Sequence, residues 1–396
     1  MNQRITWQGQ ARILAFVILS AWSLYVGGII AERMDFLRSL AAIFAGYFIF
    51  VILYTFYAGT DKGKDELLKE AFGMSGARYF VSLLAVSGQI GWYAIVIEIG
   101  GTAFAHILGV ERGAIFFLPV IVAYSMFMVW VACGGQSRIG KVSYFGIPAM
   151  VLFSLWGAYA VFMRLGMHGI MIYEPAPHMR VNFGMGVELV LASFISFSVI
   201  IPDFLHKLRR KEIFLASFWG LIPPAIFMGG LGVAFAIVGN DFNVLTTMRA
   251  LNSAWFMYAF LSVDNLSSAS ALYPIGIGFA NFSEASSPAI FERRRKFLTF
   301  FAGIMGIALA MVGVMGRLEG WLNILGTVFS PIIGVVLANQ YFVKKDFSDR
   351  KIYLPALAAW ILGCTTSFVR VGIPVLQSLA VSLIAFVAIN TMVKKK

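Results

Sequence analysis

Gln89 and Trp92 are the pair of residues whose types and spacing point most directly to ligand chemistry. They lie within residues 87–93, inside an apolar segment over about 79–109. Being three positions apart, they share one face of a helix. The indole ring offers a flat apolar surface, and the amide offers both a donor and an acceptor. This combination suits a flat heterocycle with a hydrogen-bonding edge, and the alternative is a glutamine satisfied at a helix–helix contact.

A second polar stretch, which begins at Ser262, supplies oxygen atoms of the kind that bind cations. Asp264, Ser267 and Ser268 follow helical spacing and share one face. An acid and two hydroxyls deep in an apolar span form a hard-oxygen environment suited to Na⁺ or a proton. We therefore expect a cation or substrate face here, with polar contacts between helices as the competing explanation.

Two further spans carry the small and polar residues that interrupt helices. Ser20–Ser23 and the Gly27-Gly28 pair lie in the first span, and three serines at 193, 196 and 198 precede Pro202 in the sixth. Unwound backbone exposes carbonyl groups that can coordinate a cation. For the first span, close packing of helices through small residues is the alternative.

Two acidic residues are left without an obvious role. Glu98 is nine positions from Gln89 and projects from the opposite face of the same helix. We expect it to pair with a polar group, to bind a proton, or to be a buried neutral acid. Asp203 lies near the end of the sixth span beside His206 and Lys207. We expect it to act as part of a gate or to be a solvated charge.

The composition identifies a polytopic helical membrane protein. The 396 residues are 60% hydrophobic and only 13% charged, against roughly 25% charged residues in soluble domains. Apolar runs of about 20 residues recur along the chain. No Walker motif, GxSxG elbow, paired CxxC or HxxxH pattern occurs, so we expect neither an enzyme nor a bound cofactor.

About twelve spans account for the whole chain as one membrane domain. Lys and Arg concentrate in alternate connecting segments, which places both termini in the cytoplasm of a multi-pass cell-membrane protein. The net charge of +12 then indicates topology and contact with anionic lipid and not nucleic-acid recognition. The expected spans are 11–31, 36–58, 79–109, 113–133, 143–164, 186–206, 212–238, 248–273, 297–315, 320–343, 352–368 and 373–393.

The positions of the interrupted spans suggest an internal repeat. Spans one and six lie five spans apart, which is the spacing of an inverted repeat of two five-helix halves. The first half would cover about 11–164 and the second about 186–343. Two extra helices would follow at about 352–393.

Several motifs in this order resemble the nucleobase–cation symporter-1 family, closest to its cytosine-permease branch. The matching pieces are residues 71–76, 88–93, 193–196 with Asp203-Phe204, 271–273 with 276–281, and 320–322 with Pro331 and Gly334. The resemblance implies an all-α fold of the leucine-transporter type, a 5+5 inverted repeat plus two C-terminal helices. It also implies secondary active uptake of a nucleobase or related planar heterocycle, driven by Na⁺ or H⁺.

The same resemblance assigns roles to particular residues. Gln89 would hydrogen-bond the base and Trp92 would stack on it, with Phe194, flanked by Ser193 and Ser196, on the other side. The broken first helix would lend the carbonyls of Phe16 and Leu19 to the cation and would turn Ser20 toward the substrate. The oxygen atoms of Ser262, Asp264 and Ser267, which are expected from the residues themselves and not from the resemblance, would add to these carbonyls, and a possible Na⁺ site is Phe16, Leu19, Ser262 and Asp264.

The eighth span departs from the family pattern. Where cytosine permeases carry Asn-Asp-Asn, this chain has Ser268-Ala269-Ser270. The amide expected to bind the base is therefore replaced by the hydroxyl of Ser268. Two substrate classes follow, a cytosine-like pyrimidine and a hydroxymethylpyrimidine precursor of thiamine. Asp264 is compatible with either Na⁺ or proton coupling, and a non-transporting membrane sensor or assembly protein is the alternative function.

Overall fold

The computed structural model describes residues 6–244, 247, 260–261, 272–273, 275–276, 287–369 and 372–394, and these residues form helices and their connections without any strand. The helices used below are α1 (Trp7–Ile18), α2 (Ala21–Ala31), α3 (Phe36–Tyr57), α4 (Lys64–Phe72), η1 (Gly76–Val81), α5 (Ser82–Ile107), α6 (Phe117–Cys133), α7 (Gly135–Met171), η2 (Pro177–Met179), α8 (Phe183–Ser198), α9 (Pro202–Leu205), α10 (Arg210–Gly239), α14 (Pro288–Val312), η3 (Val314–Arg317), α15 (Leu318–Ala338), η4 (Asn339–Val343), α16 (Leu354–Thr366) and α17 (Pro374–Lys394).

The long apolar helices correspond to the spans expected from the sequence. Within the described ranges, seven helices are long and apolar enough to cross a membrane, and the bent pair α1–α2 adds one more. The shorter apolar helices α6, α8 and α16 lie where spans at 113–133, 186–206 and 352–368 are expected. The expected span at 248–273 lies almost entirely outside the described residues. The helical membrane architecture predicted from composition is therefore confirmed.

The first span is broken at Leu19 and Ser20, where α1 and α2 meet at 59°. Ser20 has an extended backbone (φ −133°, ψ 157°) and occupies the N-cap of α2, a position that serine favours. The glycine pair expected to help the unwinding lies inside α2 instead. A Cβ on Gly27 would lie only 2.0 Å from the carbonyl oxygen of Gly229, so this glycine allows α2 and α10 to pack closely.

The sixth span is interrupted as well. α8 ends at Ser198 and the short α9 begins at Pro202, whose ring tolerates only the first turn of a helix. Two tyrosines of α3 satisfy polar groups at this end. The hydroxyl of Tyr54 lies 2.9 Å from the Ser198 hydroxyl, and Tyr57 donates to the carbonyl of Val199 at 3.3 Å.

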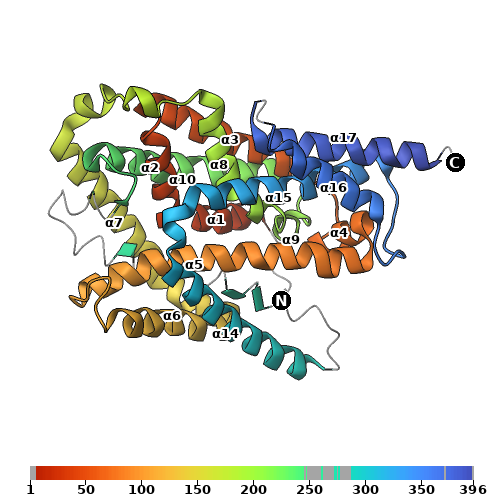
Figure 1. Ribbon diagram of the computed structural model, residues 1–396, viewed down its shortest axis with the longest axis horizontal. Coiled ribbons are helices and arrows are strands. Elements are labelled where there is room, and N and C mark those ends of the chain that lie inside the picture. Colours follow the sequence, from red (N-terminus) through yellow and green to blue (C-terminus); the bar gives the residue numbers. More distant parts are fainter. Residues whose placement is uncertain are drawn as a thin grey trace.

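α5 is the helix between two groups of packed elements (Figure 1). On one side, α5, α6 and α14 share their own apolar cluster, which includes Tyr93, Met128 and Ala302. On the other side, its glycines lie against α15, because a Cβ on Gly91 would be 2.1 Å from the ring of Trp321. This packing fixes the rotation of α5 and hence the direction of Gln89 and Trp92.

Candidate functional site

Gln89 and Ser196 line one cavity of about 60 Å³ between α5 and α8. Gln89 is partly exposed, and within the described residues its amide has no hydrogen-bond partner. The described helices therefore do not supply the contact that the alternative interpretation requires. The cavity extends to α4, and its described lining residues are Lys64, Leu68, Val81, Ser82, Ala85, Val86, Gln89, Ser196, Val199, Ile200 and Ile275.

Trp92 lies one turn beyond Gln89 and is held by two contacts. Its indole Nε1 donates to the Ser196 hydroxyl at 3.1 Å. The edge of its ring meets Trp22 of α2, with ring centroids 4.3 Å apart and planes at 75°, a T-shaped arrangement that aromatic quadrupoles favour. Gln89, Trp92 and Ser196 thus form a group that combines an amide, an indole and a hydroxyl.

Phe194 and Ser193 point away from this group. The ring of Phe194 is buried among aromatic rings of α3 and α8, with centroids 5.8 Å from Tyr47, 5.7 Å from Phe50 and 5.0 Å from Phe197. Ser193 donates to the Val190 carbonyl at 2.7 Å within its own helix. Positions 194 and 196 differ by about 200° around a helix, so only Ser196 faces α5. The structure does not place Phe194 opposite Trp92 in this conformation.

The break in the first span releases the two carbonyls expected to bind a cation. In a continuous helix the amide of Ser20 would donate to the Phe16 carbonyl, but here it donates to the Ile18 carbonyl at 2.8 Å. The amide of Ser23 likewise donates to the Ser20 carbonyl at 3.0 Å and not to the Leu19 carbonyl. The carbonyls of Phe16 and Leu19 are therefore outside the helical ladder. Both residues also line an apolar cavity of about 300 Å³ between α1, α7 and α10.

The remaining predicted ligands cannot be placed. Ser262, Asp264, Ser267 and Ser268 lie outside the described residues. In the described ranges, no three His, Cys, Asp or Glu side chains gather as a metal site. Ser20 is placed at the break, and its side chain makes no capping hydrogen bond.

Both unassigned acids have partners distant in sequence. Glu98 is 8% exposed, and its carboxylate lies 3.3 Å from the guanidinium of Arg112 at the far end of α5, so the expected pairing with a polar group is the one observed. Asp203 accepts the backbone amide of Lys64 at 2.8 Å at the start of α4. Its other oxygen lies 3.7 Å from the Lys64 ammonium, which joins α9 to the mouth of the cavity.

Sequence reasoning missed three contributors to this region. Trp22 forms the aromatic neighbour of Trp92, Tyr54 satisfies the end of α8, and Lys64 lines the cavity mouth. Trp22 follows the break by two positions, and Tyr54 and Tyr57 are three positions apart in one span. A tryptophan beside a break and a tyrosine pair within a span were the available signals.

Comparison with known proteins gives a consistent result. A family model described as "Permease for cytosine/purines, uracil, thiamine, allantoin" matches residues 10–393. The inward-facing conformation of Mhp1 is 16% identical, with a TM-score of 0.83, covering 99% of this chain and 92% of that one. No match is found among the curated proteins.

Two other solved structures share the fold. Mhp1, described as a nucleobase-cation-symport-1 family transporter, in a closed conformation with bromovinylhydantoin bound, has a TM-score of 0.79 at 16% identity, covering 98% of this chain and 91% of that one. A Na⁺-coupled sialic acid symporter in an outward-open state has a TM-score of 0.70 at 14% identity, covering 98% and 90%. Since the family model spans nearly the whole chain, the protein belongs to the family of permeases for cytosine/purines, uracil, thiamine and allantoin, and it is a membrane transporter and not an enzyme.

Proposed function

We propose that this permease imports a nucleobase or a related planar heterocycle across the cell membrane by Na⁺ symport with alternating access. The observation that carries the proposal is the Gln89 amide, which has no hydrogen-bond partner in the described part of the chain and lines a cavity with Ser196 beside the indole of Trp92. A flat ring with adjacent donor and acceptor atoms complements an amide and an aromatic surface. The bromovinylhydantoin bound to Mhp1 is a ligand of this chemical class.

Gln89 would bind the hydrogen-bonding edge of the heterocycle, and Trp92 would cover one of its faces. Ser196 holds the indole in place, and the hydroxyls of Ser20 and Ser268 complete the polar contacts. In this proposal Phe194, with Ser193, reaches the opposite face only in a state in which Ser196 has released the indole, because positions 194 and 196 differ by about 200° around α8. A cytosine-like pyrimidine and a hydroxymethylpyrimidine are the substrates that we favour.

The released carbonyls of Phe16 and Leu19 support Na⁺ as the coupling ion. Carbonyl oxygens are hard ligands suited to a metal cation, and unlike the carboxyl group of Asp264 they do not take up a proton. In the proposal, Ser262, Asp264 and Ser267 of the eighth span provide the remaining oxygens. Na⁺ binding would favour the state with higher substrate affinity, which is how the ion and substrate become coupled.

The proposed direction of access follows from the two ends of the site. The cavity reaches Lys64 and Leu68 on the α4 side, which the bias of Lys and Arg assigns to the cytoplasm. At the opposite side, Arg33 after α2 makes an ion pair with Glu319 of α15. This arrangement matches an inward-facing state with a closed external side.

The test measures uptake and binding with the same purified protein. Proteoliposomes with an inward Na⁺ gradient are given radiolabelled cytosine, uracil, hydantoin or hydroxymethylpyrimidine, and a thermal-shift screen uses the same compounds with and without Na⁺. We expect Gln89→Ala and Trp92→Ala to abolish uptake while the protein still inserts. Trp219→Ala, which removes an indole exposed on α10, is the matched control and should transport normally.

Three results would reject parts of this proposal. Normal uptake by both site variants would reject the site. A thermal shift without accumulation would identify a sensor and not a transporter. A shift that depends on pH and not on Na⁺ would reject Na⁺ coupling in favour of proton coupling.

A further inference from the structure

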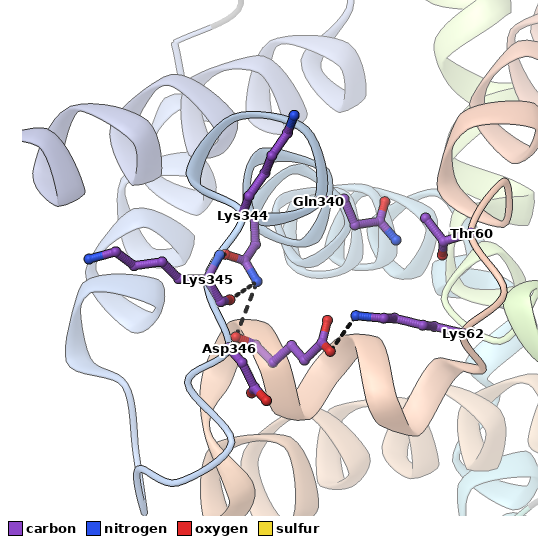
Figure 2. A pocket seen from close by; sticks show the side chains of 8 residues that line it. Thr60, Lys62, Gln340, Lys344, Lys345 and Asp346 are labelled. Carbon is purple, nitrogen blue, oxygen red and sulfur yellow. Dashed lines mark hydrogen bonds and ion pairs between the residues drawn. The ribbon is translucent and has the colours of Figure 1, made fainter.

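A third cavity, of about 290 Å³, lies where the ends of α3 and α15 meet α4 and shares no lining residue with the substrate cavity. Figure 2 shows it, with Thr60 and Gln340 facing each other on one side and Lys344 and Lys345 extending from the turn after η4. Its lining residues are Thr60, Lys62, Glu70, Asn339, Gln340, Lys344, Lys345 and Asp346. Transport by the first site gives none of these residues a role.

Two buried polar atoms in this cavity have no hydrogen-bond partner among the residues that the structure describes. They are the hydroxyl oxygen of Thr60 and the side-chain carbonyl oxygen of Gln340, while the Gln340 amide nitrogen donates to the Tyr57 carbonyl at 3.3 Å. Leaving a buried polar group unpaired is costly. A ligand that offers a hydroxyl would satisfy both atoms, because a hydroxyl donates and accepts.

Among the charged side chains that line the cavity, two lysines are able to bind an anion. Lys62 makes an ion pair with Glu70. Hydrogen bonds from the side chain and backbone of Ser348 lower the pKa of the Asp346 carboxyl, so this acid stays ionised and engaged at the rim. Lys344 and Lys345 are exposed, and neither has an ion pair within the described residues. Flexible ammonium groups of this kind bind phosphate as point charges.

The turn that carries these lysines is held by Asn339. Its side chain donates to the Lys345 carbonyl at 2.8 Å and to the Glu70 carbonyl at 3.2 Å, which ties the turn to α4. Lys344 has a left-handed backbone (φ 53°), a conformation that is uncommon for residues other than glycine. The amide of Lys344 donates to the Asn339 carbonyl at 2.7 Å, so the backbone that carries the two lysines is fixed before any ligand binds.

The cavity lies at the level where a bilayer has its head groups. α3 ends at Tyr57 and η4 ends at Val343, so Thr60 and Lys344 lie just beyond two membrane spans. Phe56 and Phe342, which are 47% and 63% exposed, provide an apolar surface next to the cavity. Basic side chains directly beyond a span, on the side assigned to the cytoplasm, are the surroundings in which anionic lipid accumulates.

From these observations we propose that this cavity binds the phosphate-bearing head group of an anionic phospholipid whose head group also carries hydroxyls, such as phosphatidylglycerol. Lys344 and Lys345 contact the phosphate, and the glycerol hydroxyls pair with Gln340 and Thr60. The bound lipid joins the end of α3 to α4 and α15. Its binding does not depend on transport by the first site.

The experiment measures the melting temperature of detergent-purified protein with short-chain phosphatidylglycerol, the matching phosphatidylcholine, or glycerol 3-phosphate. We expect phosphatidylglycerol to raise the melting temperature more than phosphatidylcholine, and glycerol 3-phosphate to raise it little. The Lys344→Gln/Lys345→Gln double variant should lose at least half of the difference between the two lipids. The Lys207→Gln/Lys211→Gln double variant removes two exposed lysines elsewhere on the same side and should keep the difference.

Thr60→Val distinguishes a built site from general charge attraction. Without lipid, this variant should melt at or above the wild-type temperature, because the hydroxyl that it removes has no partner in the described ranges. With phosphatidylglycerol, its gain should be smaller than that of the wild type. The proposal would be overturned if both lipids raised the melting temperature equally. It would also be overturned if either site variant kept the full increase with phosphatidylglycerol, or if the control double variant lost as much of the difference as the site double variant. An equal shift with glycerol 3-phosphate would overturn the lipid as the source of the ligand.

Discussion

Ser196→Ala tests the contact that positions the indole of the substrate site. The Ser196 hydroxyl accepts the hydrogen bond from Trp92 Nε1 at 3.1 Å across the gap between α8 and α5. Its removal leaves a donor unpaired, which costs about 1–3 kcal/mol for a buried group. Because this bond is only part-buried, we expect the lower end, about 1–1.5 kcal/mol, which corresponds to about a five- to tenfold change in an equilibrium constant.

The assay compares the KM of uptake and the melting temperature in Ser196→Ala, Trp92→Phe and the double variant. We expect Ser196→Ala to raise KM about five- to tenfold, with unchanged membrane insertion. The double variant should be no worse than Trp92→Phe alone, because the hydrogen bond can be lost only once. Ser382→Ala is the matched control, since the Ser382 hydroxyl donates to the Leu379 carbonyl within α17, outside the proposed substrate site. Equal effects of the two serine variants, or fully additive effects of the two single changes, would refute the reasoning.

Two further predictions concern packing and pH. Gly91→Ala should destabilise the protein by about 1–3 kcal/mol, because the new Cβ would lie 2.1 Å from the ring of Trp321. A Cβ on Gly320 would meet no atom within 4 Å, so Gly320→Ala is the control and should be tolerated. Equal melting temperatures of the two variants would contradict this prediction. Burial, with smaller contributions from Asp241 and Glu319, raises the pKa of Glu32, which follows α2. A raised pKa stabilises the folded state at low pH and loses that contribution as pH rises through the raised value. Glu32→Gln should therefore flatten the fall in melting temperature over the range just above the ordinary glutamate pKa, and an unchanged pH profile would count against this assignment.

The sequence could predict the features that depend on local pattern. Apolar runs near the length of a bilayer crossing located the helices, and helical spacing placed Gln89 and Trp92 on one face. The small and polar residues that begin at Ser20 indicated an interruption of the first span. Each of these follows from residues within one or two turns.

The rest depends on contacts between distant segments. The alternation of Ser and Phe in α8 leaves two possible faces, and the aromatic rings of Tyr47 and Phe50 on α3 decide that Phe194 turns away from α5. Asp203 meets Lys64, which lies 139 positions earlier. No periodicity within one helix reports such a partner, so the shape of the site followed only from the packed structure.

The break in the first span has a consequence for how the transporter moves. Both half-helices lie on α10: a Cβ on Gly220 would lie 2.8 Å from the Ala11 carbonyl of α1, and one on Gly232 would lie 2.0 Å from the Leu24 carbonyl of α2. Contacts this close prevent either half from sliding independently. We therefore expect the break to act as a fixed joint and not as a hinge, with α1, α2 and α10 moving as one body. The distance between the Phe16 and Leu19 carbonyls then stays constant while their surroundings change, so the affinity for a cation is adjusted by the helices that approach this body and not by the break itself.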